Sequence, residues 1–124
     1  MLKKTIQTIF IVSFFAMASL HAGSAAEVLT KQAVLSHKAV ISYKKRQSVA
    51  LLNQIQTMKM ANQQLRTKVR NPEIKNLLVF LNICLDEMKL TLKQPYSRDN
   101  VQILADLSVS IDEGTHYVKK TLNI

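Results

Sequence analysis

The chain has 124 residues, which is enough for one domain with a single hydrophobic core and too short for a multidomain enzyme. Apolar residues make up 48% of it, and it contains only two glycines and two prolines, so glycine-rich loops and frequent tight turns are excluded. Trp is absent and aromatic residues are few, which leaves little material for stacking on bases or sugar rings. We expect an all-α protein.

The first 26 residues have the pattern of a secretory signal peptide. Lys3 and Lys4 precede an apolar run that ends at Leu20, and small residues follow it. A membrane-spanning helix would need about 20 apolar residues, and this run is shorter. We expect cleavage after Ala26, with Ala22 or Ala25 as alternative ends. The mature chain would then be a single exported domain of residues 27–124 without a transmembrane segment, periplasmic in a Gram-negative source and otherwise secreted.

Residues 27–70 contain neither Gly nor Pro, and their apolar residues, beginning with Val34 and Ile41, recur at the spacing of one helical face. The apolar pattern weakens across residues 44–48. Either one helix runs through this stretch, or two helices meet near Arg46. Because the stretch contains no residue typical of turns, we expect one long or kinked helix.

Two further helices are predicted after the first proline. Asn71 can accept hydrogen bonds from the free amides of a helix that starts with Pro72, so a helix is expected over 72–94. Ser97 can cap a helix over 98–122 in the same way. The bundle would therefore have three long helices, or four if the first segment is broken. The expected core stripe of the middle helix is Ile74, Leu78, Leu81, Leu85, Met88 and Leu92.

The helix expected over 72–94 has more apolar surface than a three-helix bundle can cover. Residues 77–85 are apolar on every side except at Asn82, and a helix of this kind must be buried all round. Either a fourth helix covers the surplus, or a partner protein or second copy does. In the second case Val79 and Phe80 are the expected contact residues.

Two small residues have structural interpretations. Cys84 is the only cysteine, so no intramolecular disulfide can form, and its apolar surroundings favour a buried, unreactive thiol. An intermolecular disulfide and a catalytic thiol are the alternatives. Gly114 lies on the apolar face of the last helix, where its lack of a side chain indicates close helix packing rather than contact with a ligand.

Basic charge is concentrated in the first half of the mature chain. Residues 27–71 carry nine Lys and Arg against Glu27, a net charge of +8, whereas residues 72–124 carry six basic and seven acidic residues. We expect Lys44, Lys45 and Arg46 to form the centre of a surface for an acidic protein. A solvated face without a partner and an anionic envelope polymer or lipid are the alternatives. Nucleic acid is not expected, because the chain is exported and lacks interleaved aromatic residues.

The sequence contains no phosphate-binding loop and no HExxH, G-x-S-x-G or CxxC motif, so we expect a protein that is not an enzyme. One spacing typical of metal sites is present: Glu113 and His116 form an E-x-x-H pair, which di-iron helical bundles use twice. His37 is the other histidine of the mature chain. A metal or haem site formed by His116 with His37 or Glu113 is therefore the alternative hypothesis.

An exported helical chain of this length, with Pro72 and Glu73 in its third quarter and His116 and Tyr117 near its end, resembles the soluble periplasmic b-type cytochromes. The resemblance implies haem inside a four-helix bundle, with a Met from the first helix and a His from the last as iron ligands. The mature chain has no Met in the matching first part. His37 would then replace it.

Together these patterns favour a small non-enzymatic binding or accessory protein of the cell envelope that holds no cofactor and docks on another protein. An adaptor, a chaperone-like protein and an immunity protein all fit this description. The alternative is a periplasmic four-helix-bundle protein that binds haem or metal.

Overall fold

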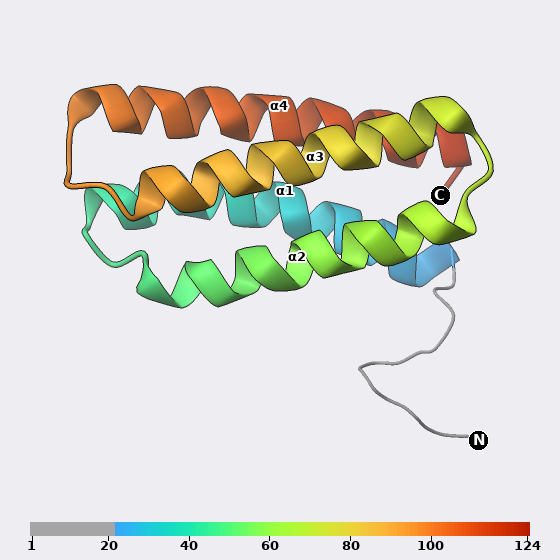
Figure 1. The fold of residues 1–124 in the computed structure, drawn as a ribbon, viewed down its shortest axis with the longest axis horizontal. Coiled ribbons are helices and arrows are strands. Elements are labelled where there is room, and N and C mark those ends of the chain that lie inside the picture. The colour runs from blue at the N-terminus through green and yellow to red at the C-terminus, as the bar shows by residue number, and fades with distance from the viewer. Residues whose placement is uncertain (1–21) are drawn as a thin grey trace, which may run out of the picture.

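The computed structural model describes residues 22–124, which form four helices: α1 (Ala22–Lys44), α2 (Val49–Lys68), α3 (Pro72–Leu92) and α4 (Arg98–Leu122). Consecutive helices run antiparallel (Figure 1). α1 packs against α2 and α4, and α3 packs against the same two helices on the opposite side of the bundle. The expected all-α fold is confirmed in its four-helix form.

Much of the expected signal peptide lies outside the described residues. Its last residues, Ala22 to Ala26, form the beginning of α1. No helix in the part of the chain that the structure describes is long and apolar enough to cross a membrane.

The prediction of one helix over 27–70 is wrong, because α1 and α2 are separate antiparallel helices. The chain reverses at Arg46, which has a left-handed backbone with a φ of 57°. The amide of Gln47 donates to the carbonyl of Ser42 at 2.8 Å, and the amide of Arg46 donates to that of Tyr43 at 3.0 Å. These bonds form a Schellman motif, in which the left-handed residue is usually Gly. The alternative of two helices that meet near Arg46 is therefore correct, and the sequence did not favour it because Arg occupies the position where Gly is usual.

Contacts with the α3–α4 connection surround this turn, and both lie at the same end of the bundle (Figure 1). The hydroxyl of Tyr43 donates to the carbonyl of Pro95 at 2.6 Å and accepts from the amide of Ser97 at 3.2 Å. The rings of Tyr43 and Tyr96 are stacked with their centroids 5.6 Å apart, and the guanidinium carbon of Arg46 lies 4.2 Å from the Tyr96 centroid. A cation–π contact thus accompanies the left-handed conformation of Arg46.

The predicted starts of α3 and α4 and the end of α4 are confirmed, whereas α3 ends at Leu92, two residues before its expected end. The side-chain oxygen of Asn71 accepts hydrogen bonds from the amides of Glu73 and Ile74, at 2.8 and 3.4 Å. The hydroxyl of Ser97 accepts one from the amide of Asn100 at 3.0 Å. Both caps satisfy amides that lack a partner within the helix.

The core stripe of α3 is also as predicted, since all six of its apolar residues are buried. Gly114 of α4 packs against this stripe, because a Cβ atom at its position would lie only 2.8 Å from a methyl carbon of Leu81. The prediction of close helix packing at Gly114 is therefore confirmed.

The core face of α1 differs from the prediction. Val34 and Ile41, which the apolar spacing assigned to the core, are 53% and 55% exposed. The helix instead buries two leucines, Leu29 and Leu35, together with polar, small and aromatic residues: Ala25, Gln32, Ser36, Ala39 and Tyr43. Apolar spacing could not identify this face, because much of it is not aliphatic.

Buried amides satisfy one another where α1, α2 and α3 meet. Gln32 and Asn62 each donate to the other's side-chain oxygen at 2.9 Å. Asn62 also donates to Asn82 at 2.9 Å, and Asn82 donates to the backbone carbonyl of Lys59 at 3.2 Å. A satisfied buried network favours one arrangement of the helices, because sliding or turning any of them would leave amides unpaired.

Replacing Asn62 with Ala should lower the free energy of unfolding by about 2 kcal/mol, because the Gln32 amide would lose both of its bonds to Asn62 in the interior. Urea unfolding followed by circular dichroism measures the change. Asn53→Ala is the control, since Asn53 is an exposed residue of the same helix. An equal loss in the two variants would contradict the structural role of the network.

Candidate functional site

The three consecutive basic residues lie at one end of the bundle but do not have equivalent surroundings. Lys44 and Lys45 are exposed, whereas the guanidinium of Arg46 packs on Tyr96. Arg46 Nη1 also lies 3.4 Å from the carbonyl of Lys44. Arg46 therefore contributes to the structure of the turn, and the two lysines are the freer part of the predicted binding surface.

A longer basic surface, which the sequence interpretation missed, continues from this turn along α1. We call it the α1 stripe; its five residues are all exposed and alternate between basic and apolar: Lys31, Val34, Lys38, Ile41 and Lys45. Within the described part of the chain, none of its lysines forms an ion pair. The seven-residue spacing of the lysines was the signal that could have identified it, because residues seven apart share a helix face.

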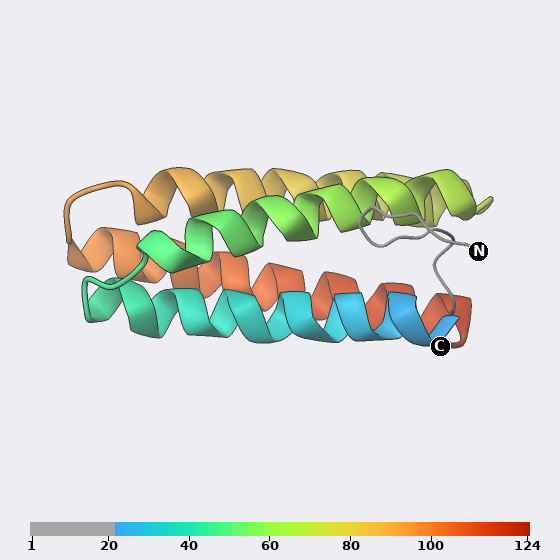
Figure 2. The same ribbon diagram turned by 90° about the horizontal axis from the view of Figure 1, so that it is seen from below.

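A groove with a volume of about 310 Å³ lies beside the α1 stripe, between α1 and α2. These two helices form one broad face of the bundle, which is nearest the viewer in Figure 2. Leu35 is buried and Met58 half-buried in the groove, and its other lining residues are Thr30, Lys31, Val34, Lys38, Gln54 and Thr57. The groove therefore combines apolar surface with two ammonium groups.

Although the bundle has four helices, α2 and α4 cover only part of the surplus apolar surface of α3. Leu78 and Leu81 are buried, but Val79 and Phe80 are 39% and 43% exposed, and Ile83 is exposed beside them. Phe80 lines a shallow depression with Gly114 and other residues of α4. We call Val79, Phe80 and Ile83 the α3 patch.

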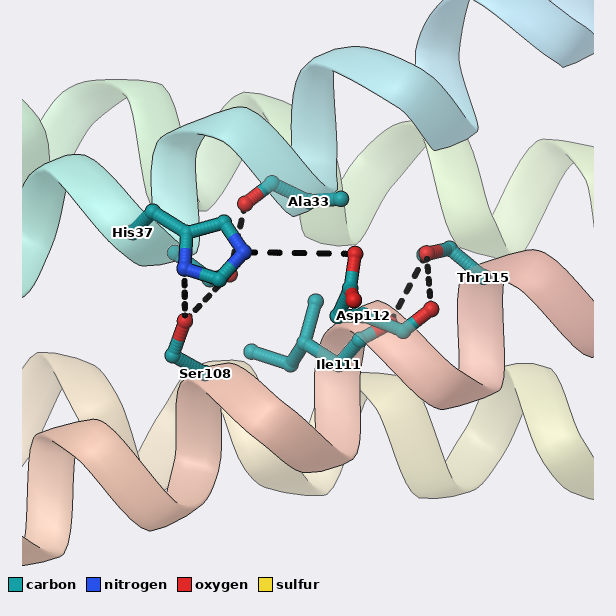
Figure 3. Close-up of polar contacts among 7 residues, drawn as sticks. Ala33, His37, Ser108, Ile111, Asp112 and Thr115 are labelled. Carbon is teal, nitrogen blue, oxygen red and sulfur yellow. Dashed lines mark hydrogen bonds and ion pairs between the residues drawn. The ribbon is translucent and has the colours of Figure 1, made fainter.

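His37 lies in a polar cluster that joins α1 to α4 (Figure 3). Its Nδ1 atom is 2.8 Å from the hydroxyl oxygen of Ser108, and its Nε2 atom is 3.9 Å from a carboxylate oxygen of Asp112. The hydroxyl of Ser108 also lies 3.2 Å from that of Ser36. Sequence reasoning missed this cluster because its two halves are about 70 residues apart in the chain.

Ser, His and Asp are also the residue types of hydrolytic triads, but this cluster does not present a nucleophile. Ser108 is only 2% exposed, and its hydroxyl is shared between His37 and Ser36. A nucleophilic oxygen must reach the substrate. The cluster is therefore a bridge between two helices.

The structure does not form the interior site expected for haem or metal. His37 is exposed and directed at Ser108 and Asp112, and His116 and Glu113 are exposed on α4. An interior site would need both imidazoles to point into the bundle, where Gln32, Ser36 and aliphatic residues are buried instead. In the described residues, no group of three His, Cys, Asp or Glu side chains is arranged to hold a metal ion.

Comparison of the chain with protein-family models, with curated proteins and with solved structures gives no match.

Cys84 is buried in the core, as predicted. Burial raises the pKa of its thiol, and the negative charge of Glu87 raises it further. Both effects disfavour the thiolate, which is the reactive form of cysteine.

We expect Cys84 to react with Ellman's reagent much more slowly in the folded protein than in urea, because folding both covers the thiol and raises its pKa. Absorbance of the released thiolate measures the rate in each state. Rapid, complete reaction of the folded protein would show that the thiol is accessible and would contradict this prediction.

Proposed function

We propose that this chain is an exported, non-enzymatic accessory protein of the cell envelope that docks on an acidic protein. The contact surface would be the face formed by α1, α2 and the turn between them. The signal-peptide pattern of the first 26 residues supports export, and the absence of the common catalytic motifs from the sequence supports a binding role.

The α1 stripe is the observation that carries the proposal. Three lysines without ion pairs in the described part of the chain alternate with two exposed aliphatic residues along one helix. By contrast, Lys59 of α2 forms an ion pair with Asp86 of α3. Much of the charge on the stripe is therefore available to a partner.

The two residue types on the stripe have different roles in binding. The lysines attract an acidic surface over a distance of about 8 Å at physiological salt and so accelerate association. Val34 and Ile41 supply apolar area. Full burial of such a side chain contributes roughly 1.5 to 3 kcal/mol, and about half of each side chain is still exposed and available for burial by a partner. An interface that uses both would weaken with salt but would not be abolished by it.

Reversing the charge of Lys44 and Lys45 tests the proposal at the turn, and Arg46 is kept because its contact with Tyr96 is part of the fold. We expect the K44E/K45E variant to capture less of an acidic protein from an extract of the source organism than the native protein does. Raising the salt concentration should reduce capture by the native protein. Once purified, the captured protein should bind the variant at least tenfold more weakly in calorimetry.

The matched control is K75E/K120E, which makes the same change of charge on α3 and α4 at the end of the bundle opposite the turn. Circular dichroism should show the same helix content in all three proteins. If both variants lose affinity equally, only net charge matters. If K44E/K45E binds as the native protein does at every salt concentration, the turn is a solvated surface and its part in the proposal fails.

The α3 patch supports a second proposal, self-association through α3. Its three side chains are apolar, adjacent and exposed. We expect the native protein to form dimers at high micromolar concentration and Phe80→Glu to be monomeric, because a charge would be buried at the contact. Light scattering measures the mass of each. Val109→Glu is the control, because Val109 is an exposed apolar residue of α4. A native protein that is monomeric without a partner would overturn this proposal.

A further inference from the structure

We infer that the groove between α1 and α2 receives one acidic amphipathic helix, which lies along the bundle as a fifth helix. The inference rests on the proposed function and specifies its partner. It concerns the groove beside the α1 stripe and not the turn at Lys44 and Lys45.

We call the line along which two neighbouring helices meet at the surface their seam. The α1–α2 seam lacks the surface side-chain contacts that bridge the other three seams of the bundle within the described residues. His37 and Asp112 approach across the α1–α4 seam, where Lys119 also donates to Thr30 at 2.9 Å. The α2–α3 seam has the pair formed by Lys59 and Asp86. The α3–α4 seam has a hydrogen bond of 3.0 Å from Tyr117 to Glu73.

Between α1 and α2, the only side-chain hydrogen bonds in the described part of the chain are those of the buried Gln32–Asn62 pair. Between this buried pair and the solvent, no side-chain hydrogen bond or ion pair in the described residues connects α1 to α2, and the groove opens at the surface there. Leu35 and Met58 provide apolar surface within it, and the half-exposed Val34 lies on its α1 side. An amphipathic helix recognises a groove of this kind by placing its apolar face into it.

The charges beside the groove select an acidic helix. Lys31 and Lys38 both line the groove from α1 and form no ion pair within the described residues. The polar residues on the α2 side, Gln54 and Thr57, are uncharged. An acidic side chain on the bound helix would therefore meet a free ammonium group on one side and no competing carboxylate among the lining residues.

The spacing of the lysines favours an extended ligand over a small anion or a lipid headgroup. Residues seven apart on a helix are separated by about 10.5 Å, so Lys31 and Lys38 would have to bend toward each other to contact one carboxylate or phosphate, whereas each can contact a separate acidic side chain of an extended ligand. The whole α1 stripe, from Lys31 to Lys45, extends over about 21 Å. A helix of similar length with acidic residues seven apart matches this arrangement, and its apolar residues at every third and fourth position would face the groove.

Binding of synthetic helices to the full chain tests the inference. The first probe is a fluorescein-labelled peptide of about 15 residues, the length that spans the α1 stripe, with Leu at every third and fourth position and Glu on the flanks. The second has the same composition in an order that destroys the amphipathic pattern, and the third has Lys in place of every Glu. Fluorescence anisotropy measures each affinity, and vesicles containing phosphatidylglycerol provide a fourth, lipid probe.

We expect the acidic amphipathic peptide to bind at least tenfold more tightly than the other two peptides. The K31E/K38E variant should lose at least tenfold of this affinity, and V34S should lose a smaller part, because the first removes the charge contacts and the second apolar area. The K75E/K120E control should bind as the native protein does. A rise in peptide helicity on binding, measured by circular dichroism, would show that the ligand binds as a helix.

Each contrary result is informative. If the scrambled acidic peptide binds as tightly as the amphipathic one, the basic surface takes acidic chains in general; the groove inference fails and the proposed function survives. If neither acidic peptide binds and extracts also yield no acidic partner, both fail. If only the vesicles bind, and K31E/K38E abolishes their binding, the face is a lipid surface and the fifth-helix inference is overturned.

Discussion

The mutual hydrogen bonds of Gln32 and Asn62 are the constraint on which the candidate surface depends. Two buried amides that satisfy each other at 2.9 Å require a polar face of α1 to point into the bundle. Because a helix has only one inward face, this requirement turns the opposite face, with Val34, Ile41 and the lysines of the α1 stripe, toward solvent. A polar contact in the core thus determines the composition of the exposed surface.

The same helix is bounded by two different seams. On the α4 side, Ser36, His37 and Ser108 connect the helices through short polar contacts, which continue from the core to the surface. On the α2 side the polar contacts are confined to the buried amides, and the surface of the seam is a groove. This difference explains why the proposed ligand lies between α1 and α2, although basic residues also occur elsewhere on the bundle.

The turn at Arg46 connects the fold to the charge distribution. Because the chain reverses at this turn, the basic residues of α1 and those of α2 lie on two neighbouring helices of one face instead of along a single long helix. Arg46 adopts a conformation that Gly usually takes, and its contact with Tyr96 accompanies that conformation. Loss of this residue would therefore affect the shape of the proposed surface as well as its charge.

Sequence alone was sufficient to predict the elements whose signals are local. Asn71 and Ser97 could be identified as caps because capping depends on residues only a few positions away, and the stripe from Ile74 to Leu92 follows directly from helical periodicity. It also determined the segregation of charge and the surplus of apolar residues on α3. The inward face of α1 and the contact of His37 with Ser108 could not be predicted in this way, because the partners that satisfy those polar groups are some 30 and 70 residues away in the chain. The exposure of Val34 and Ile41 has the same cause. Apolar spacing indicates which residues could be buried, but long-range hydrogen bonds determine which face of α1 is buried.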